Sequence, residues 1–327
     1  MAPLLQVNNL YIHIQKGKDK LLAVEDMSFS LDYGGTLGIV GESGCGKSIT
    51  CLALTRLCAD AISITGGEVL FEGNSLLGLN NREFRALRRG AFSMIFQDSI
   101  AGLNPLIKAG AQIAEALEYL KLPRNQVKKR VLGLIEKVGL ENPAMVADKY
   151  PHQMSGGQRQ RIMIAISLAA EPKLLIADEP TTALDVTTQL QILKLLRDLQ
   201  AETGMGLIMI SHDVGVIKEM CENVAVMYSG QIVEAGVTKD VFADPKHPYT
   251  IGLIKSASCA KFKGELLHSI PGTVAPLEKR QYITGCVFAD RCDVRCERSQ
   301  QPAPTTTLAG GRVVRCHSLL EGSGTGA

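Results

Sequence analysis

Two stretches of the sequence hold residues that could bind phosphate groups. The run GESGCGKS at residues 41–48 fits the spacing G-x-x-x-x-G-K-[ST], in which glycines let successive backbone N–H groups converge on the phosphates of a nucleotide. The run MSGGQRQRIMIAISLA at residues 154–169 places Ser155 and two glycines before a long helical pattern, which is typical of a helix N-cap. Both runs predict anion binding at the start of a helix.

The segments that flank the first run support a nucleotide site. TLGIV before it has the pattern of a buried strand, and ITCLALTRL after it has the pattern of a helix, as this motif requires. Lys47 would reach the outer phosphates, and Ser48 would ligate magnesium. The contacts expected for the nucleotide along this loop are Gly41, Ser43, Gly44, Cys45, Gly46, Lys47, Ser48 and Ile49.

The second run separates this chain from other proteins that carry a phosphate loop. GTPases and kinases share the first motif but have no use for a second anion site at residues 154–158. One chain seldom needs two such sites for one triphosphate. We therefore expect the second site to serve the nucleotide held by another subunit, in a head-to-tail dimer with two composite sites. Its residues are Ser155, Gly156, Gly157 and Gln158.

With these two runs the chain resembles the ATP-binding subunits of ABC transporters. The signature of that family is usually LSGGQ, and here Met154 stands in its leading position. The resemblance implies an α/β fold of the P-loop NTPase type, an ABC nucleotide-binding domain over residues 1–245. This domain would have a β-rich edge and an inserted helical subdomain at about residues 98–170. ATP and Mg²⁺ are the implied ligands.

Further motifs of the family follow in the expected order. KLLIADEP at residues 173–180 is an apolar strand that ends in two carboxylates, the Walker B pattern. By resemblance, Asp178 holds magnesium through water and Glu179 polarises the attacking water, a division of labour that suits phosphoryl transfer. Gln97 in SMIFQD resembles the Q-loop glutamine, which senses magnesium, the water and the membrane partner.

Three more residues match the family by position. Asp185 in TTALD resembles the D-loop residue at the dimer interface, and His212 in LIMISHD resembles the switch histidine that contacts the γ-phosphate. A lone histidine or glutamine is more often structural, and an Asp-Glu pair at a strand end is commonly a helix cap, but five motifs in order favour the functional interpretation. Tyr11, in LYIHI, either stacks on adenine or only packs.

Composition and patterning agree with a large globular ATPase. The chain has 327 residues, 46% of them hydrophobic, and a net charge of +2, which is too small to indicate a nucleic-acid partner. Helical patterns such as AQIAEALEYL and VKKRVLGLIEKVGL fall between residues 98 and 170, while short strands and turns are expected before residue 95. The sequence shows no signal-peptide pattern and no apolar stretch of 18 residues.

A cysteine cluster follows in the last part of the chain, at residues 246–327. Cys286, Cys292, Cys296 and Cys316 lie within 31 residues, with the spacing C-x5-C-x3-C-x19-C. In a reducing compartment such a cluster favours a metal over disulfides. Four thiolates suit a [4Fe–4S] cluster or tetrahedral zinc on chemistry alone, and unligated thiols are the third possibility.

The same region narrows the resemblance to one branch of the family. HPYT at residues 247–250, LNP at residues 103–105 and the cysteine-bearing tail are similar to the ATPases of peptide and nickel uptake. This resemblance favours the [4Fe–4S] cluster over zinc, with a structural role in a small irregular extension.

The resemblance therefore implies an ATP-hydrolysing subunit that powers an importer of peptides, nickel or a metal chelate. Its expected partners are two integral membrane permease subunits, a second homologous ATPase in a heterodimer and, indirectly, an extracytoplasmic substrate-binding protein. It would lie at the cytoplasmic face of the inner membrane. The alternative is a soluble ABC ATPase of translation or DNA repair, but such proteins usually carry two cassettes or long insertions, and this chain has one cassette.

Overall fold

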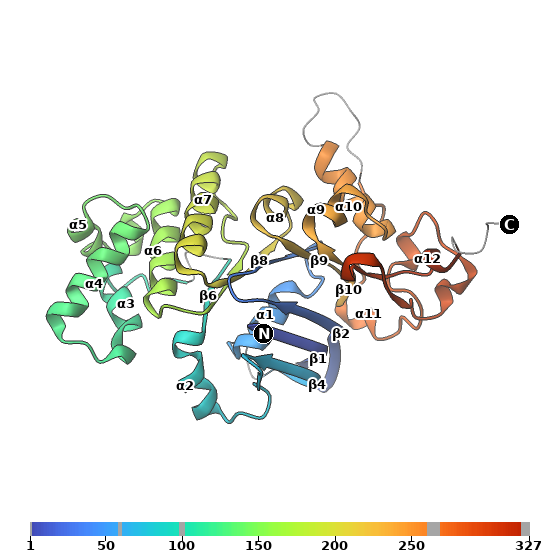
Figure 1. Cartoon of the computed structure of the whole chain (residues 1–327), viewed down its shortest axis with the longest axis horizontal. Helices are drawn as coiled ribbons and strands as arrows, with labels where there is room; N and C mark the ends of the chain where they lie inside the picture. Colours follow the sequence, from blue (N-terminus) through green and yellow to red (C-terminus); the bar gives the residue numbers. More distant parts are fainter. Residues whose placement is uncertain (1, 58–60, 98–101, 260–268, 322–327) are drawn as a thin grey trace. The chain divides into compact units, whose positions relative to one another are not determined.

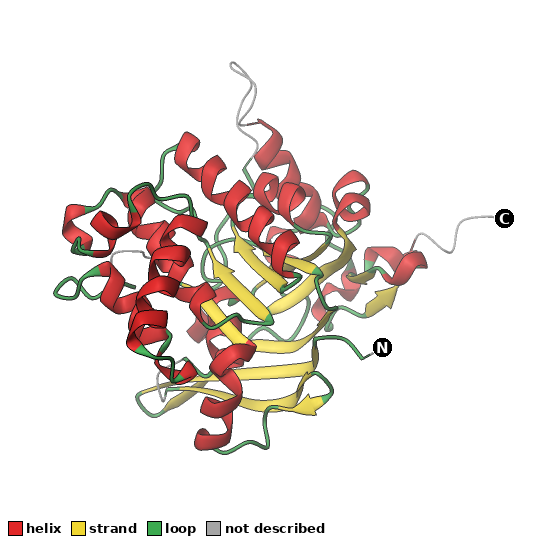
Figure 2. Ribbon diagram, turned by 60° about the vertical axis from the view of Figure 1, so that its left-hand side comes forward, coloured by secondary structure: helices red, strands yellow, loops and turns green. Residues whose placement is uncertain are grey.

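The computed structural model describes residues 2–57, 61–97, 102–259 and 269–321. The chain divides into two compact units. Figure 1 shows the helices and strands with their labels, and Figure 2 shows them coloured by type. The first unit comprises Met1–Asp32, Thr36–Gly78 and Met209–Ala327, and the second comprises Tyr33–Gly35 and Leu79–Ile208. None of the helices in the described ranges combines the length and apolar content that crossing a membrane requires.

The amino-terminal part of the first unit is an antiparallel sheet. Its strands run in the order β2-β1-β4-β5. Leu5 of β1 lies opposite Leu31 of β2 and Phe71 of β4, so apolar residues meet across the sheet and bury one face. Two of these strands have 12 and 13 residues and are longer than the short strands expected. Their bounds are Leu5–Lys16 (β1), Asp19–Leu31 (β2), Ile62–Phe71 (β4) and Asn74–Ser75 (β5).

A second sheet of this unit carries the phosphate-loop motif. Strand β3 (Thr36–Val40) is buried at every position and pairs in parallel with β9 (Asn223–Tyr228), as its unbroken apolar pattern predicts. Helix α8 (Val214–Met220) packs on β3. Strand β9 turns at Ser229 and Gly230, both with positive φ, into the antiparallel β10 (Gln231–Val237). The two strands and this turn form a β-hairpin.

The carboxyl-terminal extension consists of short elements. Two of them are strands that continue the edge of the second sheet: β12 pairs with β10, and β11 pairs with β12. The sequence predicted an irregular extension, because strands of three residues leave no recognisable periodicity. The elements from residue 238 on are α9 (Thr238–Ala243), α10 (Pro248–Cys259), α11 (Leu277–Arg280), η3 (Ala289–Arg291), η4 (Glu297–Gln300), β11 (Thr305–Thr307), η5 (Ala309–Gly311), β12 (Val313–Arg315) and α12 (Ser318–Glu321).

The second unit is mainly helical. Its strands β6 (Phe92–Ile95) and β7 (Leu174–Asp178) pair in parallel. The predicted helices are confirmed, and α3 to α6 fall inside the range 98–170, of which residues 98–101 lie outside the described chain. The helices and 3-10 turns are α2 (Asn81–Ala91), α3 (Ala109–Ala116), η1 (Glu118–Leu120), α4 (Arg124–Lys137), α5 (Pro143–Ala147), η2 (Pro151–Gln153), α6 (Gly156–Ala169) and α7 (Val186–Thr203).

Helix α2 was not among the expected elements. Its N-terminus carries a capping box, in which the Asn80 side chain accepts the backbone N–H of Glu83 and the Glu83 side chain accepts that of Asn80. This pattern of Asn followed three residues later by Glu is a readable start signal for a helix. The four arginines of this helix leave little apolar periodicity to support a helix prediction.

Candidate nucleotide site

The phosphate loop of the first unit lies between β3 and the start of α1 (Lys47–Thr55). Gly46 is the N-cap of α1 and has a φ of 108°, which L side chains rarely adopt. A Cβ atom at Gly41 would lie 2.1 Å from the carbonyl oxygen of Met227. Both positions therefore require glycine, and at Gly41 the loop keeps its backbone close to β9.

Lys47 lies over this loop and is only 6% exposed. Its Nζ donates to the carbonyl oxygens of Gly41 at 2.7 Å and of Glu42 at 3.0 Å. Phosphate oxygens of a nucleotide could replace these carbonyls as acceptors. Ser48 follows in the first turn of α1, where its hydroxyl could take the role of a magnesium ligand.

The sequence did not predict a role for Tyr249 at this site. Its hydroxyl accepts the backbone N–H of Glu42 at 2.9 Å. Tyr249 is fully buried, and its ring packs against those of Tyr228 and Phe288, with centroids 4.7 and 5.5 Å away. The HPYT pattern marked this segment in the sequence. No pattern in the nearby sequence indicates that Tyr249 contacts the phosphate loop, which lies 207 positions earlier in the chain.

A buried ion pair fixes the segment that carries Tyr249. The fully buried carboxylate of Glu234 pairs with Arg312 and accepts the backbone N–H groups of Lys246 and His247 at 2.9 and 3.0 Å. The Nδ1 atom of His247 accepts the N–H of Tyr249 at 3.0 Å, so His247 acts as the cap of α10. Burial lowers the pKa of His247 to about 3 and keeps this acceptor neutral.

Tyr11, the predicted adenine contact, lies half-buried in the middle of β1. Its ring covers Gly66 on the neighbouring strand, where an added Cβ would lie 3.3 Å from the ring. Burial raises the pKa of Tyr11, and the charges of Asp26 and Glu25 add to this rise. The ring therefore packs within the sheet, and its role toward adenine stays a prediction.

In the second unit, the predicted catalytic carboxylates lie at the end of β7. Asp178 is the last residue of the strand and is buried, and Glu179 follows with a φ of 46°. The Oε2 atom of Glu179 accepts the side-chain amide of Gln97 at 3.1 Å and the hydroxyl of Thr182 at 2.9 Å. The structure thus brings together Gln97 and Glu179, two residues that the sequence placed in one catalytic group.

The predicted N-cap of the signature run is confirmed. Ser155 precedes α6, its Oγ accepts the N–H of Gln158 at 3.3 Å, and the Gln158 side chain accepts the N–H of Ser155 at 3.2 Å. A Cβ at Gly157 would lie 2.7 Å from the Cγ2 atom of Thr188. The second glycine thus allows close packing against α7 within the same chain.

Asp185 and His212 occupy the ends of other elements. Asp185 is the N-cap of α7 and accepts the N–H and hydroxyl of Thr188 at 2.9 and 2.7 Å; these hydrogen bonds lower its pKa. His212 is exposed and directly follows β8 (Gly206–Ser211). Among the predicted nucleotide-site residues, Tyr11, residues 41–49 and His212 belong to the first unit. The second unit holds Gln97, Asp178, Glu179, residues 155–158 and Asp185.

The four clustered cysteines of the extension are free thiols in the structure. Burial raises the pKa of Cys286 and Cys292, and nearby thiols, including Cys316, add to both rises. Within the described ranges, however, no group of three or more His, Cys, Asp or Glu side chains is arranged to hold a metal ion. This geometry does not fit the predicted [4Fe–4S] or zinc ligand set.

Comparison with known proteins extends these observations. Residues 24–182 match the ABC transporter family, and residues 233–298 match the carboxyl-terminal region of oligopeptide/dipeptide transporters. A putative peptide import ATP-binding protein of Brucella abortus is 44% identical over 98% of this chain and 96% of its own length. The dipeptide transport ATP-binding protein DppD of Bacillus subtilis is 40% identical over 98% of this chain and 99% of its own.

A solved structure of an ATP-binding cassette is similar to this chain in fold. The dimeric ATP-binding cassette MJ0796, in a post-hydrolysis state with ADP and Pi, matches with a TM-score of 0.64 at 27% identity, over 72% of this chain and 98% of that one. Identity of 40% or more to the two relatives along nearly the whole chain decides the assignment. The chain therefore belongs to the ABC transporter family and is an ATPase of that family.

Proposed function

We propose that the chain is the ATP-hydrolysing subunit that powers an ABC importer of peptides. The observation that carries this proposal is the match of residues 233–298 to the carboxyl-terminal region of oligopeptide/dipeptide transporters. The two relatives described above are named for peptides and dipeptides, which favours these cargoes over nickel or a metal chelate.

The proposed chemistry is hydrolysis of Mg²⁺-bound ATP. Lys47 binds the outer phosphates, and Ser48 and Asp178 hold magnesium. Glu179 orients the attacking water, and its contacts with Gln97 and Thr182 support this role because they fix the carboxylate. His212 contacts the γ-phosphate. Positioning and charge neutralisation supply most of the catalysis in such a reaction.

The proposed active species is a dimer of two ATPase subunits. Residues 155–158 act on the nucleotide held by the partner's phosphate loop, with Asp185 near the interface. The N-cap geometry at Ser155 supports the role, because amides at a helix start attract anions. The matching MJ0796 cassette is dimeric. A second, homologous ATPase is the partner that we propose.

The subunit would act at the cytoplasmic face of the inner membrane, on two permease subunits supplied with cargo by an extracytoplasmic binding protein. We keep a [4Fe–4S] cluster at Cys286, Cys292, Cys296 and Cys316 as the metal proposal. The spacing of the four cysteines in the sequence supports it, but the side chains would have to rearrange to bind a metal. The cluster would then stabilise the extension and take no part in hydrolysis.

Reconstitution tests the proposed transport function. The chain is expressed with candidate permease subunits and a second ATPase subunit of the same organism, and the complex is placed in vesicles together with a candidate substrate-binding protein. Di- and oligopeptides should stimulate ATP hydrolysis and accumulate in the vesicles, and Glu179→Gln should abolish both. Stimulation by nickel alone would show that the cargo is nickel and not a peptide. Isolation of the chain with ribosomes or DNA in place of membrane proteins would overturn the transporter assignment.

A further inference from the structure

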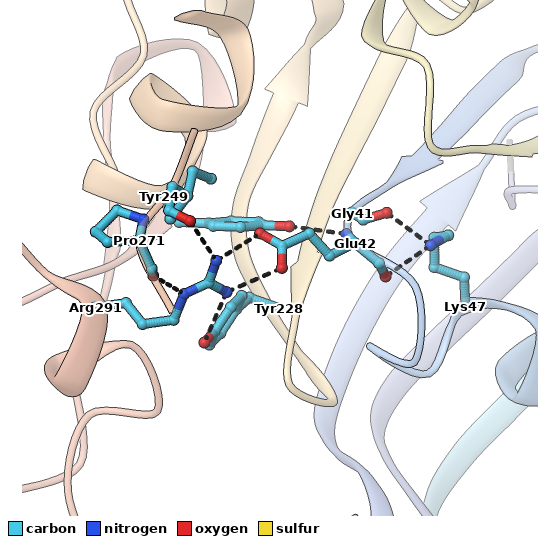
Figure 3. A network of polar contacts seen from close by, with 8 residues as sticks. Gly41, Glu42, Lys47, Tyr228, Tyr249, Pro271 and Arg291 are labelled. Atoms are coloured by element: carbon cyan, nitrogen blue, oxygen red, sulfur yellow. Dashed lines mark hydrogen bonds and ion pairs between the residues drawn. The ribbon is translucent and has the colours of Figure 1, made fainter. Parts of the chain in front are cut away.

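A side chain of the carboxyl-terminal extension binds directly to the phosphate loop. The guanidinium of Arg291 forms a two-point ion pair with Glu42, with Nη1···Oε2 at 2.9 Å and Nη2···Oε1 at 3.2 Å (Figure 3). The two residues are 249 positions apart, and the Arg291 side chain is only 7% exposed. Paired bonds of this kind fix orientation as well as distance.

The rest of the Arg291 guanidinium is held from the other side. Its Nε donates to the carbonyl oxygen of Pro271 at 2.7 Å, and Nη2 donates to that of Ile270 at 3.2 Å. Nη1 also reaches the hydroxyl of Tyr228 at 3.4 Å, and the guanidinium carbon lies 5.7 Å from the centre of that ring. The extension therefore presents a preoriented charge to Glu42.

Glu42 connects this charge to the nucleotide site. Its N–H donates to the buried Tyr249 hydroxyl at 2.9 Å, and its carbonyl oxygen accepts Lys47 Nζ at 3.0 Å (Figure 3). Arg291 thus holds the side chain of Glu42, and Tyr249 holds its backbone N–H. The carbonyl oxygen of the same residue accepts a hydrogen bond from Lys47, the lysine expected to bind phosphate. A shift of Glu42 would move an acceptor of Lys47 and the backbone next to it.

Charge gives a second reason for the pair. Without Arg291, the Glu42 carboxylate would place an uncompensated negative charge within the loop that must bind a polyanionic nucleotide. Like charges that are partly shielded from water repel each other strongly. Arg291 neutralises that carboxylate. We propose that Arg291, with Tyr249, is a positioning residue for the phosphate loop, and that the carboxyl-terminal extension thereby sets the affinity of the chain for nucleotide.

Equilibrium binding to the purified full chain tests this proposal. The probe is magnesium with AMP-PNP, an ATP analogue that is not hydrolysed. Arg291→Ala should raise its Kd by about 10-fold, the effect of one uncompensated charge at moderate distance. Arg291→Lys should give a smaller rise, because it keeps the charge and loses the second bond. Arg295→Ala is the matched control in the same extension, since Arg295 pairs only at the surface with Asp290, and its Kd should not change.

A double variant separates the effect of the uncompensated Glu42 charge from a general effect on folding. If the repulsion of Glu42 causes the loss, Glu42→Gln combined with Arg291→Ala should recover much of the affinity, although it breaks the same ion pair. Steady-state hydrolysis should show a raised KM with kcat largely kept. An unchanged Kd in folded Arg291→Ala protein would overturn the proposal. Should that variant fail to fold, unchanged affinity in both Arg291→Lys and Tyr249→Phe would overturn it as well.

The proposal rests on the nucleotide role proposed above, and Lys47→Ala distinguishes the two. If wild-type protein does not bind AMP-PNP, or binds it without dependence on Lys47, the nucleotide-site assignment fails. If binding depends on Lys47 but not on Arg291, only the positioning role fails. The assay needs no permease or peptide, so an error in the proposed cargo leaves it unaffected.

Discussion

The side-chain amide of Gln97 donates to the carboxylate of Glu179 over 3.1 Å, across 82 positions of the chain. Glu179 itself has a φ of 46°, a left-handed conformation that few residues other than glycine adopt. Surrounding structure must hold such a residue in place, and strained positions of this kind concentrate at functional sites. The contact therefore favours a positioned catalytic carboxylate over a simple helix cap.

Exchange of Glu179 for Gln tests this assignment. Gln keeps the shape of the side chain but removes the charge that orients water, so hydrolysis should fall by roughly 1,000-fold while ATP binding is retained. Binding and steady-state hydrolysis are measured separately. Lys47→Ala is the contrasting variant and should weaken binding itself by roughly 10- to 100-fold. Full activity in Glu179→Gln would exclude this residue as the catalytic carboxylate.

The signature run allows a test of the composite dimer site. Ser155→Arg introduces bulk where the partner's γ-phosphate should approach, so hydrolysis should fall by about 100-fold, as when a charge-stabilising contact is lost. Nucleotide binding by the isolated chain should survive. Ser155→Ala is the matched control, because it removes the cap at a cost of about 1 kcal/mol in stability without adding bulk. Loss of binding in the monomer would mean that residues 154–158 serve their own phosphate loop.

Much of the site could be predicted because its signals are local. The glycines at 41 and 46 and the lysine beside them follow a fixed spacing, and the apolar runs on either side of the loop have the periods of a strand and a helix. The capping box at Ser155 needs only four consecutive residues. In each case a short segment determines its own backbone, so the pattern is visible without the rest of the fold.

Other contacts could not be predicted because they join distant segments. Nothing near Glu42 indicates that Arg291 neutralises it or that Tyr249 binds its backbone. Strand β12 forms because β10 offers an open edge, a condition that its own three residues do not encode. Phe288 of the extension packs against Tyr228 and Tyr249, a second contact between distant segments that the local sequence does not indicate.

The metal proposal for the extension can be tested directly. Protein purified without oxygen should be brown and contain about four irons per chain, and Cys292→Ser should bleach it. The same substitution should expose the extension to proteolysis. Cys221→Ser is the control outside the extension; burial raises the pKa of Cys221 to about 12, so this thiol stays protonated. One zinc per chain would decide for the other metal. Metal-free protein with an equally resistant extension would exclude both.

The last prediction concerns the dependence of stability on pH through His247. Burial lowers its folded-state pKa to about 3, against an ordinary value of 6.5. Between these two values the unfolded chain binds a proton that the folded chain does not. The contribution is therefore fully present above pH 6.5 and is lost as the pH falls, by about 1.4 kcal/mol per pH unit. From pH 7 to pH 5 this amounts to about 2 kcal/mol.

The variant His247→Asn keeps an acceptor for the N–H of Tyr249 but cannot take up a proton, and Asn is a favourable N-cap. Thermal unfolding of both proteins at pH 7 and pH 5 measures the difference. Glu234 and Arg312, which hold the same segment, are present in both the wild type and the variant. Their contribution to the change in stability with pH therefore cancels when the two proteins are compared. The wild-type midpoint should fall further than that of the variant between pH 7 and pH 5. Parallel curves would show that His247 does not remain neutral and buried in the folded protein, and that the cap of α10 tolerates its charged form.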